Sequence, residues 1–291
     1  MKQKSLVLSS LFVAALAGCG GGSASAPINY EANTDAPTAP ISAVVFKPVN
    51  ASSCDQLSYA HLPLGDYALK NNPWGQGETT DFTQCVSGSS VGTVIDNTAV
   101  QTGAKAKFSW DWPSQNASSN IKAYPEILYR PGGKGLASIP FTEVAGLTVN
   151  HDVSLAATTT GDYNLTYDIW VDSTAASADT DRWPHKAEIM IKVHQTWKDD
   201  PKLDTITVNG NQFQVFEHTV VYPSYNWEWK VLVFASQKPL LKASIPLKPF
   251  IDYLVAKNYL LQSDHISTIE FGAELKRGKG TATINSYSVK R

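Results

Sequence analysis

Three stretches of this chain alternate apolar and polar residues at period two, the pattern of a β-strand that packs one face on a core. They are residues 163–172, 186–194 and 268–276. Each has acidic residues on its polar face: Asp168, Glu188, and Glu270 with Glu274. If the strands are neighbours in one concave sheet, their carboxylates converge in one groove. The alternative is that each acid is a solvated edge residue, the usual place for a charged side chain.

The remainder of the chain after residue 50 also predicts short strands, because turn residues interrupt it at frequent intervals. Asn209-Gly210, between two apolar-rich runs, is a hairpin signal. Residues 247–258 fit a period of 3.6 better and predict the one short helix. The stretches 268–275 and 281–289 are interpreted as a tight hairpin around residues 276–280. The predicted fold is all-β, an antiparallel sandwich or barrel.

Composition agrees with a β-rich secreted protein, since the 291 residues are 43% hydrophobic and 17% charged, with 8 Trp and 12 Tyr. The net charge of −2 gives no strong attraction to nucleic acid, and no phosphate-binding glycine motif is present. Six histidines show no close pair with metal-ligand spacing, so neither a metal nor another cofactor is expected.

The N-terminus has the features of a targeting segment. Lys2 and Lys4 precede an apolar run that is too short to span a bilayer. Leu16-Ala17-Gly18-Cys19 resembles a bacterial lipobox, which implies cleavage before Cys19 and lipidation of that residue. We therefore expect a signal peptide over 1–18, a flexible tether over 19–50 and one domain over 51–291. The lipid would attach the protein to the outer membrane, on its periplasmic or its exterior side. An ordinary signal peptide is the alternative.

The chain has three cysteines. With Cys19 lipidated, two remain in an oxidising compartment, and we expect Cys54 and Cys85 to form a disulfide. Two free buried thiols are the alternative.

Two carboxylates that face one another on a concave sheet suit the catalytic pair of a glycoside hydrolase. One attacks the sugar or activates water, and the other, held protonated, donates to the leaving oxygen. Aromatic rings offer flat apolar surfaces to sugar rings. Trp227 and Trp229 face the same way and fit either such a surface or the core.

Six sequence blocks, in the same order, resemble glycoside hydrolase family 12, the jelly-roll β-1,4-glucanases and xyloglucanases. The blocks are Cys54-Asp55-Gln56, Asn71-Asn72-Pro73-Trp74-Gly75, Trp110-Asp111-Trp112 with residues 120–125, Tyr167-Asp168-Ile169-Trp170, Glu188-Ile189-Met190-Ile191 and Phe271-Gly272-Ala273-Glu274. The resemblance extends from about Cys54 to Val289 and implies a jelly-roll sandwich of two antiparallel sheets with a concave substrate cleft.

The resemblance also implies residue roles. Glu188 would be the nucleophile, Glu274 the acid/base, and Asp168 a hydrogen-bond partner that supports the nucleophile. The mechanism would be retaining, with the two catalytic carboxyl groups roughly 5–5.5 Å apart. The residues expected to contact substrate are Asn72, Trp74, Met190, Trp170, Lys192 and Lys276.

Departures from the family pattern concern the edges of the cleft. Lys192 stands where the family usually has Trp, and Leu275-Lys276 follows Glu274 where Pro-Phe is usual. The two ammonium groups would lie near the cleft and lower the pKa of Glu274. Because residues that usually line the cleft are replaced, the preference among β-glucans stays open.

The sequence therefore predicts a lipid-anchored, monomeric endo-β-1,4-glucanase that acts on xyloglucan, cellulose derivatives or mixed-linkage glucan. A non-catalytic glycan-binding lipoprotein on the same fold is the alternative, although such a protein has no need for both Glu188 and Glu274. A xylanase of the related jelly-roll clan is disfavoured by the blocks at residues 71–75 and 271–274.

Overall fold

The computed structural model describes residues 43–56, 59–113, 120–130, 138–175, 185–199, 201–223 and 226–291. Residues 43–291 form one compact unit. The predicted signal peptide, Cys19 and most of the predicted tether lie outside the described residues and stay predictions. No helix in the described ranges has the length and apolarity needed to cross a membrane.

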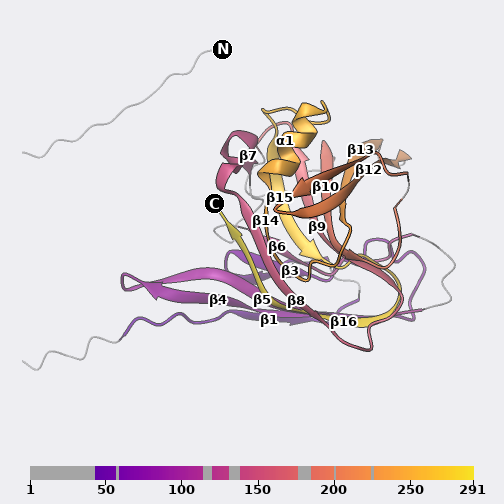
Figure 1. Ribbon diagram of the computed structural model, residues 1–291. Helices are drawn as coiled ribbons and strands as arrows, with labels where there is room; N and C mark the ends of the chain where they lie inside the picture. Colours follow the sequence, from indigo (N-terminus) through magenta and orange to yellow (C-terminus); the bar gives the residue numbers. More distant parts are fainter. Residues whose placement is uncertain are drawn as a thin grey trace, which may run out of the picture. The chain divides into compact units, whose positions relative to one another are not determined.

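The described strands form one nearly closed 16-stranded sheet, joined through β16 and β9, and its two halves, called here the back and front sheets, pack face to face (Figure 1), as the jelly-roll prediction requires. The back sheet has the order β1-β4-β5-β16-β8-β14, with bounds Asn50–Ser53, Thr83–Ile95, Thr98–Trp112, Leu275–Lys290, Thr148–Leu155 and Lys242–Pro246. The front sheet has the order β2-β3-β6-β15-β9-β10-β13-β12-β11, with bounds Leu62–Leu64, Tyr67–Lys70, Glu126–Tyr129, His265–Gly272, Asp162–Asp172, Ala187–Gln195, Trp227–Ser236, Asn211–Tyr222 and Asp204–Val208. The two-residue strand β7 (Ile139–Pro140) pairs with the start of β15.

The core lies between the sheets and is built from the apolar alternate positions of the strands. On β10 these positions are fully buried, and they are Ala187, Ile189, Ile191 and Val193. Because successive side chains of a strand point to opposite faces, the same pleat turns the polar alternate positions to the other side of the front sheet.

Among the strands that the structure describes, one pair of neighbours departs from the antiparallel pattern, because β10 and β13 run parallel. Between them the chain forms the hairpin of β11 and β12, closed by Asn209 and Gly210. Both residues have positive φ, of 48° and 75°, the conformation of a type I′ turn, so the hairpin prediction is confirmed.

The short helix is also confirmed, as α1 over Lys248–Ala256. Pro249 lies in its first turn, where a missing N–H costs nothing. Its buried residues Phe250, Ile251 and Leu254 face the sandwich, and the Phe250 ring meets Phe234 of β13 edge-on at 4.9 Å between centroids. A 3-10 helix, η2, covers Phe141–Gly146.

The tight hairpin expected around residues 276–280 is wrong. β15 ends at Gly272, and Leu275 already belongs to β16, which pairs briefly with β9 and then continues through the back sheet. Gly278 has φ 95° and approaches Gly161 so closely that an added Cβ would lie 2.6 Å from the Gly161 Cα. The glycine therefore permits β16 to pass the turn at Gly161, and Glu274 lies in the crossover between the sheets.

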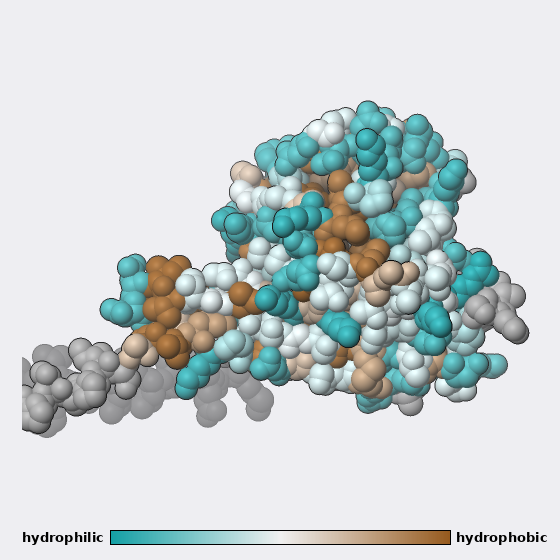
Figure 2. All heavy atoms as spheres, turned by 60° about the horizontal axis from the view of Figure 1, so that its bottom comes forward, coloured by the Kyte–Doolittle hydropathy of each residue, from teal (hydrophilic) through white to brown (hydrophobic). Residues whose placement is uncertain are grey.

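A long arm formed by β4 and β5 extends from the sandwich (Figures 1 and 2). The first described residues run beside it, with the Phe46 ring over Gly92 and backbone hydrogen bonding between Val49 and Ser90. Apolar side chains gather at its end (Figure 2), and the exposed large ones in these segments are Val44, Val45, Val49, Val94 and Ile95.

Candidate active site

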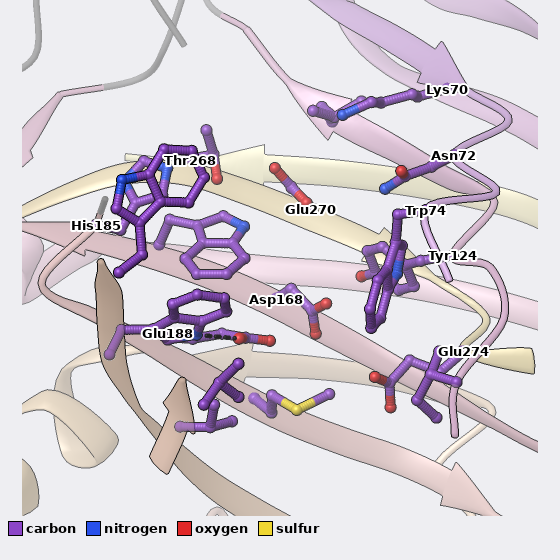
Figure 3. A pocket seen from close by; sticks show the side chains of 18 of the residues that line it. Lys70, Asn72, Trp74, Tyr124, Asp168, His185, Glu188, Thr268, Glu270 and Glu274 are labelled. Carbon is purple, nitrogen blue, oxygen red and sulfur yellow. Dashed lines mark hydrogen bonds between the residues drawn. The ribbon is translucent and has the colours of Figure 1, made fainter. Parts of the chain in front are cut away.

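The acids on the three alternating strands meet on one face of the front sheet. β9 lies between β10 and β15, so Asp168 is opposite both Met190 and Glu270, and Glu188 is opposite Trp170. Asp168, Glu188, Glu270 and Glu274 line one cavity of about 420 Å³. In Figure 3 the carboxyl groups of Glu188 and Glu274 face the same space, with Asp168 between them. The convergence expected from the period-two pattern is therefore present.

Glu188 is held from the neighbouring parallel strand. The indole Nε1–H of Trp229 on β13 donates a hydrogen bond of 3.0 Å to Glu188 Oε2. Burial raises the pKa of the Glu188 carboxyl to about 8, an effect that the Trp229 hydrogen bond opposes and the charge of Glu274 increases. Trp229, which the sequence left open between core and cleft, is thus a cleft residue that stabilises the ionised form of Glu188.

Glu274 is held by Asn164 on β9. The Asn164 amide nitrogen donates to Glu274 Oε2, and the backbone N–H of Glu274 donates to Asn164 Oδ1 at 3.2 Å. Burial raises the pKa of Glu274, while the ammonium groups of Lys192 and Lys276 and the Asn164 hydrogen bond lower it. The lysines act in the direction that the sequence indicated, but burial outweighs them and the net shift is upward.

Asp168 has no such donor. It is buried, and its Oδ1 has no hydrogen-bond partner among the residues that the structure describes. Burial, followed by the charges of Glu188 and Glu274, raises the pKa of Asp168 well above its usual range. Asp168 is therefore the carboxyl group of this cluster that is best placed to hold a proton near neutral pH.

The loop at residues 71–75 reaches the cavity because each residue type meets a local requirement. The side chain of Asn71 is buried and bonds to the backbone of Asp55 and Gln84. Asn72 adopts φ 41°, which asparagine tolerates better than most residues. A Cβ at Gly75 would lie 2.1 Å from the Ile121 carbonyl oxygen, so only glycine fits there.

Aromatic side chains form the walls of the cavity. Trp74 is 47% exposed at one side. At the other side Trp170 stacks on His185 with 4.9 Å between centroids, and Trp229 stacks on Tyr222. Flat, partly open rings on both sides of a row of carboxyl groups suit a chain of sugar rings.

Four of the six residues expected to contact substrate line the cavity, namely Asn72, Trp74, Trp170 and Met190. Lys192 and Lys276 are not among the lining residues. Lys192 is buried and its Nζ lies 2.8 Å from Asp199 Oδ1, while Lys276 Nζ lies 4.0 Å from the centre of the Trp197 ring. Lys192 Nζ also lies 5.6 Å from the centre of the Trp197 ring, so both ammonium groups lie near that ring, and both charges act on Glu274.

Sequence analysis did not single out Glu126, Asn164 or the hydrogen bond from Trp229. Asn164 lies on the polar face of the alternating run at 163–172, a pattern that could have indicated it, whereas Glu126 begins the run Glu-Ile-Leu-Tyr, which does not alternate and gives no such signal. The parallel pairing that brings Trp229 to Glu188 cannot be recognised from the sequence around either residue. Across the described ranges, no three His, Cys, Asp or Glu residues are grouped so as to hold a metal ion.

The disulfide is present between Cys54 and Cys85, 31 residues apart in the sequence. It confirms the cysteine prediction and joins the segment before the 71–75 loop to β4 of the back sheet.

Comparison with known proteins gives a consistent result. The family model described as Glycosyl hydrolase family 12 matches residues 65–290. Endoglucanase S of Pectobacterium parmentieri is 27% identical over 246 residues, which cover 82% of this chain and 87% of that protein. The inactive glycoside hydrolase XLP1 of Phytophthora nicotianae (strain INRA-310) is 26% identical over 259 residues, or 84% of this chain and 94% of that protein.

Among solved structures, a family 12 xyloglucanase from Bacillus licheniformis in complex with ligand superposes with a TM-score of 0.66. The two chains are 23% identical, and the match covers 83% of this chain and 99% of the xyloglucanase chain. This likeness supports the fold.

Proposed function

The chain belongs to glycosyl hydrolase family 12, and from this premise we propose that it is a retaining endo-β-1,4-glucanase with Glu188 and Glu274 as its catalytic pair. It is a glycoside hydrolase. The observation that supports the catalytic pair is that Glu188 and Glu274 line the same cavity, and that each carboxyl group accepts a hydrogen bond, from Trp229 and from Asn164 respectively. The 27% identical relative is named an endoglucanase, which supports a β-glucan substrate.

The proposed reaction has two steps. Glu188 attacks the anomeric carbon and forms a glycosyl-enzyme while Glu274, protonated, donates to the leaving oxygen. Glu274 then takes a proton from water, which attacks the same carbon and releases Glu188. The raised pKa of Glu274 suits a general acid near neutral pH.

Asp168 supports Glu188 in this proposal. Asp168 and Glu188 are diagonal neighbours on adjacent strands, a separation that side chains can bridge. A protonated Asp168 within reach of Glu188 would supply a donor that favours the ionised, nucleophilic form of Glu188. The Trp229 hydrogen bond acts in the same direction.

Release of reducing ends from carboxymethylcellulose, xyloglucan and mixed-linkage glucan tests the activity, and side-by-side rates show which glucan is preferred. We expect release by the wild-type protein and loss of at least a thousandfold in Glu188→Gln and in Glu274→Gln. Proton NMR of fresh hydrolysate should show the β anomer first. Absence of hydrolysis on all three glucans would favour the glycan-binding alternative, for which the inactive relative gives a precedent.

We also propose that the protein is a monomer attached to the outer membrane by a lipid on Cys19. The support is the 16–19 tetrapeptide, followed by a segment rich in Gly, Ser, Ala and Pro that would act as a tether. A labelled fatty acid fed to expressing cells should appear in the wild-type protein and not in Cys19→Ser, which should leave the membrane fraction. Light scattering of the domain would show the mass of one chain.

A further inference from the structure

A second pair of carboxyl groups lies beside the catalytic cluster. β6 is the neighbour of β15, with Glu126 opposite Gly272 and Glu270 opposite Leu128, so Glu126 and Glu270 are diagonal neighbours on one face. Glu126 is completely buried, and Glu270 is 8% exposed and lines the cavity. In Figure 3 the Glu270 side chain points into the pocket between Asn72 and Asp168.

These two acids are placed to share a proton. Diagonal neighbours on adjacent strands can bring their side-chain ends together, and a hydrogen bond between two carboxyl groups requires a proton on one of them, because an ionised carboxylate has no hydrogen to donate. Glu126 Oε1 accepts from Asn72 Nδ2 at 3.1 Å, whereas Glu126 Oε2 finds no other donor in the described part of the chain. Burial, with the charge of Glu270 next, raises the pKa of Glu126 well above its usual range. Glu126 is therefore the member of the pair better placed to hold a proton, which it would donate toward Glu270.

Glu270 lies opposite Asp168 of β9 and on a different strand from Glu188. From β10, with Glu188, to β15, with Glu270, there are two strand spacings of ~4.8 Å each. A β-1,4-linked glucosyl unit is of similar length to one spacing. A glucan that crosses the strands with one unit at Glu188 would thus place a different unit, further toward Asn72, over Glu270.

An ionised carboxylate that is fixed in a cleft accepts strong hydrogen bonds from hydroxyl groups. Glu270 lines the cavity together with Asn72, whose Nδ2 donates to Glu126 Oε1 on the strand next to that of Glu270. Lys70, whose Nζ lies 3.9 Å from Glu126 Oε1, is at the cavity edge. The arrangement suits adjacent hydroxyls of one sugar ring.

We propose that Glu270 is a substrate-binding residue that accepts hydrogen bonds from the hydroxyls of a glucosyl unit distant from the cleaved bond. Glu126 is the positioning residue that holds Glu270 through the shared proton. This inference rests on the proposed glucanase function and adds a binding site that serves long substrates.

The test compares Glu270→Gln and Glu126→Gln with wild type, and uses Asp152→Asn on the exposed part of the back sheet as a matched acid-to-amide control. For hydrolysis of cellohexaose, we expect Glu270→Gln to raise KM about tenfold or more, because hydrogen bonds to a charged group would be weakened. We expect kcat to change less than threefold. Glu126→Gln keeps a donor for Glu270 and should show a smaller rise. Asp152→Asn should equal wild type.

Chain length separates binding from a purely structural effect. The ratio of kcat/KM for cellohexaose to that for cellotriose should fall about tenfold in Glu270→Gln and stay constant in the control. An unchanged KM and an unchanged ratio in Glu270→Gln, with wild-type hydrolysis intact, would reject this inference and leave the proposed function standing.

If wild type does not hydrolyse cellohexaose, the proposed function fails, and calorimetric titration of cellohexaose still tests the site. A tenfold weaker affinity of Glu270→Gln would support the site in a binding protein. Equal affinities would reject it.

Discussion

Trp229 donates its indole N–H to Glu188 Oε2 at 3.0 Å from β13, a strand that runs parallel to the strand of Glu188. The contact joins residues 41 positions apart, and it depends on the parallel pairing of β10 with β13, which departs from the antiparallel pairing of the other described strands. The hydrogen bond stabilises the charge that the proposed nucleophile needs.

Replacing Trp229 by Phe should therefore impair catalysis at the nucleophile. The ring is kept but the donor is lost, and a hydrogen bond to a charged group contributes ~1.5–3 kcal/mol. We expect kcat/KM to fall about tenfold or more. Because the donor lowers the pKa of Glu188, its loss raises that pKa and moves the acid limb of the kcat/KM profile to higher pH. An unchanged acid limb would contradict this role for Trp229.

Gly75 in the 71–75 loop and Gly77 just after it give a matched pair of glycine substitutions. In Gly75→Ala the new methyl group would lie 2.1 Å from the Ile121 carbonyl oxygen, so the loop with Asn72 and Trp74 must shift. Gly77→Ala meets nothing within 4 Å and is disfavoured only by its φ of 58°, at a cost of ~1–2 kcal/mol.

We expect Gly75→Ala to raise KM on a soluble glucan at least fivefold, and Gly77→Ala to leave KM at the wild-type value while lowering stability slightly. Steady-state kinetics with thermal unfolding of both variants checks this. Equal KM values for the two variants would show that the loop position does not matter for binding.

The fold and the positions of the acids follow largely from local pattern. Period-two alternation places Asp168 and Glu188 on the cleft face because a strand has only two faces, and Asn209-Gly210 specifies its hairpin through the backbone conformation of those residues. The same pattern cannot say which strands are neighbours. The contact from Trp229 and the pairing of Glu126 with Glu270 arise from strand order alone.

Gly278 shows a second limit of local pattern. Glycine in a sequence signals either a turn or a close approach of two backbones, and here it permits β16 to pass the turn at Gly161. The identity of the neighbour is not encoded near residue 278, so the interpretation as a hairpin was wrong although the strand at 281–289 was correct.

Stability should decrease as pH rises from about 5 to 8. The pKa of Glu188 is raised to about 8 and that of Glu126 well above its usual range. The folded protein therefore keeps protons that the unfolded chain has released above about pH 4.5. Each such group lowers the free energy of unfolding by about 1.4 kcal/mol per pH unit until its folded pKa is passed.

Glu126→Gln removes one of these groups, because glutamine is neutral in both states. Urea unfolding at pH 5, 6, 7 and 8 should show a shallower loss of stability for this variant than for wild type. Parallel losses in the two proteins, or a wild-type stability that rises over this range, would contradict the proton assignment to Glu126.

The disulfide between Cys54 and Cys85 closes a loop that contains Asn72 and Trp74. A loop of this length contributes ~3–4 kcal/mol in the chain-entropy model. The double variant Cys54→Ser/Cys85→Ser should unfold at a correspondingly lower urea concentration, and reductant should lower the stability of wild type but leave that of the double variant unchanged. Insensitivity of wild type to reductant would show that the bond adds nothing to stability.

Covalent trapping of the glycosyl-enzyme tests the assignment of the nucleophile most directly. The protein would be incubated with a 2-deoxy-2-fluoro β-cellobioside that has a dinitrophenyl leaving group, digested, and its peptides sequenced by mass spectrometry. We predict a single added fluorocellobiosyl group on Glu188. A label on Glu274, Glu270 or Asp168, or inhibition without any covalent label, would contradict the assignment of Glu188 as the nucleophile.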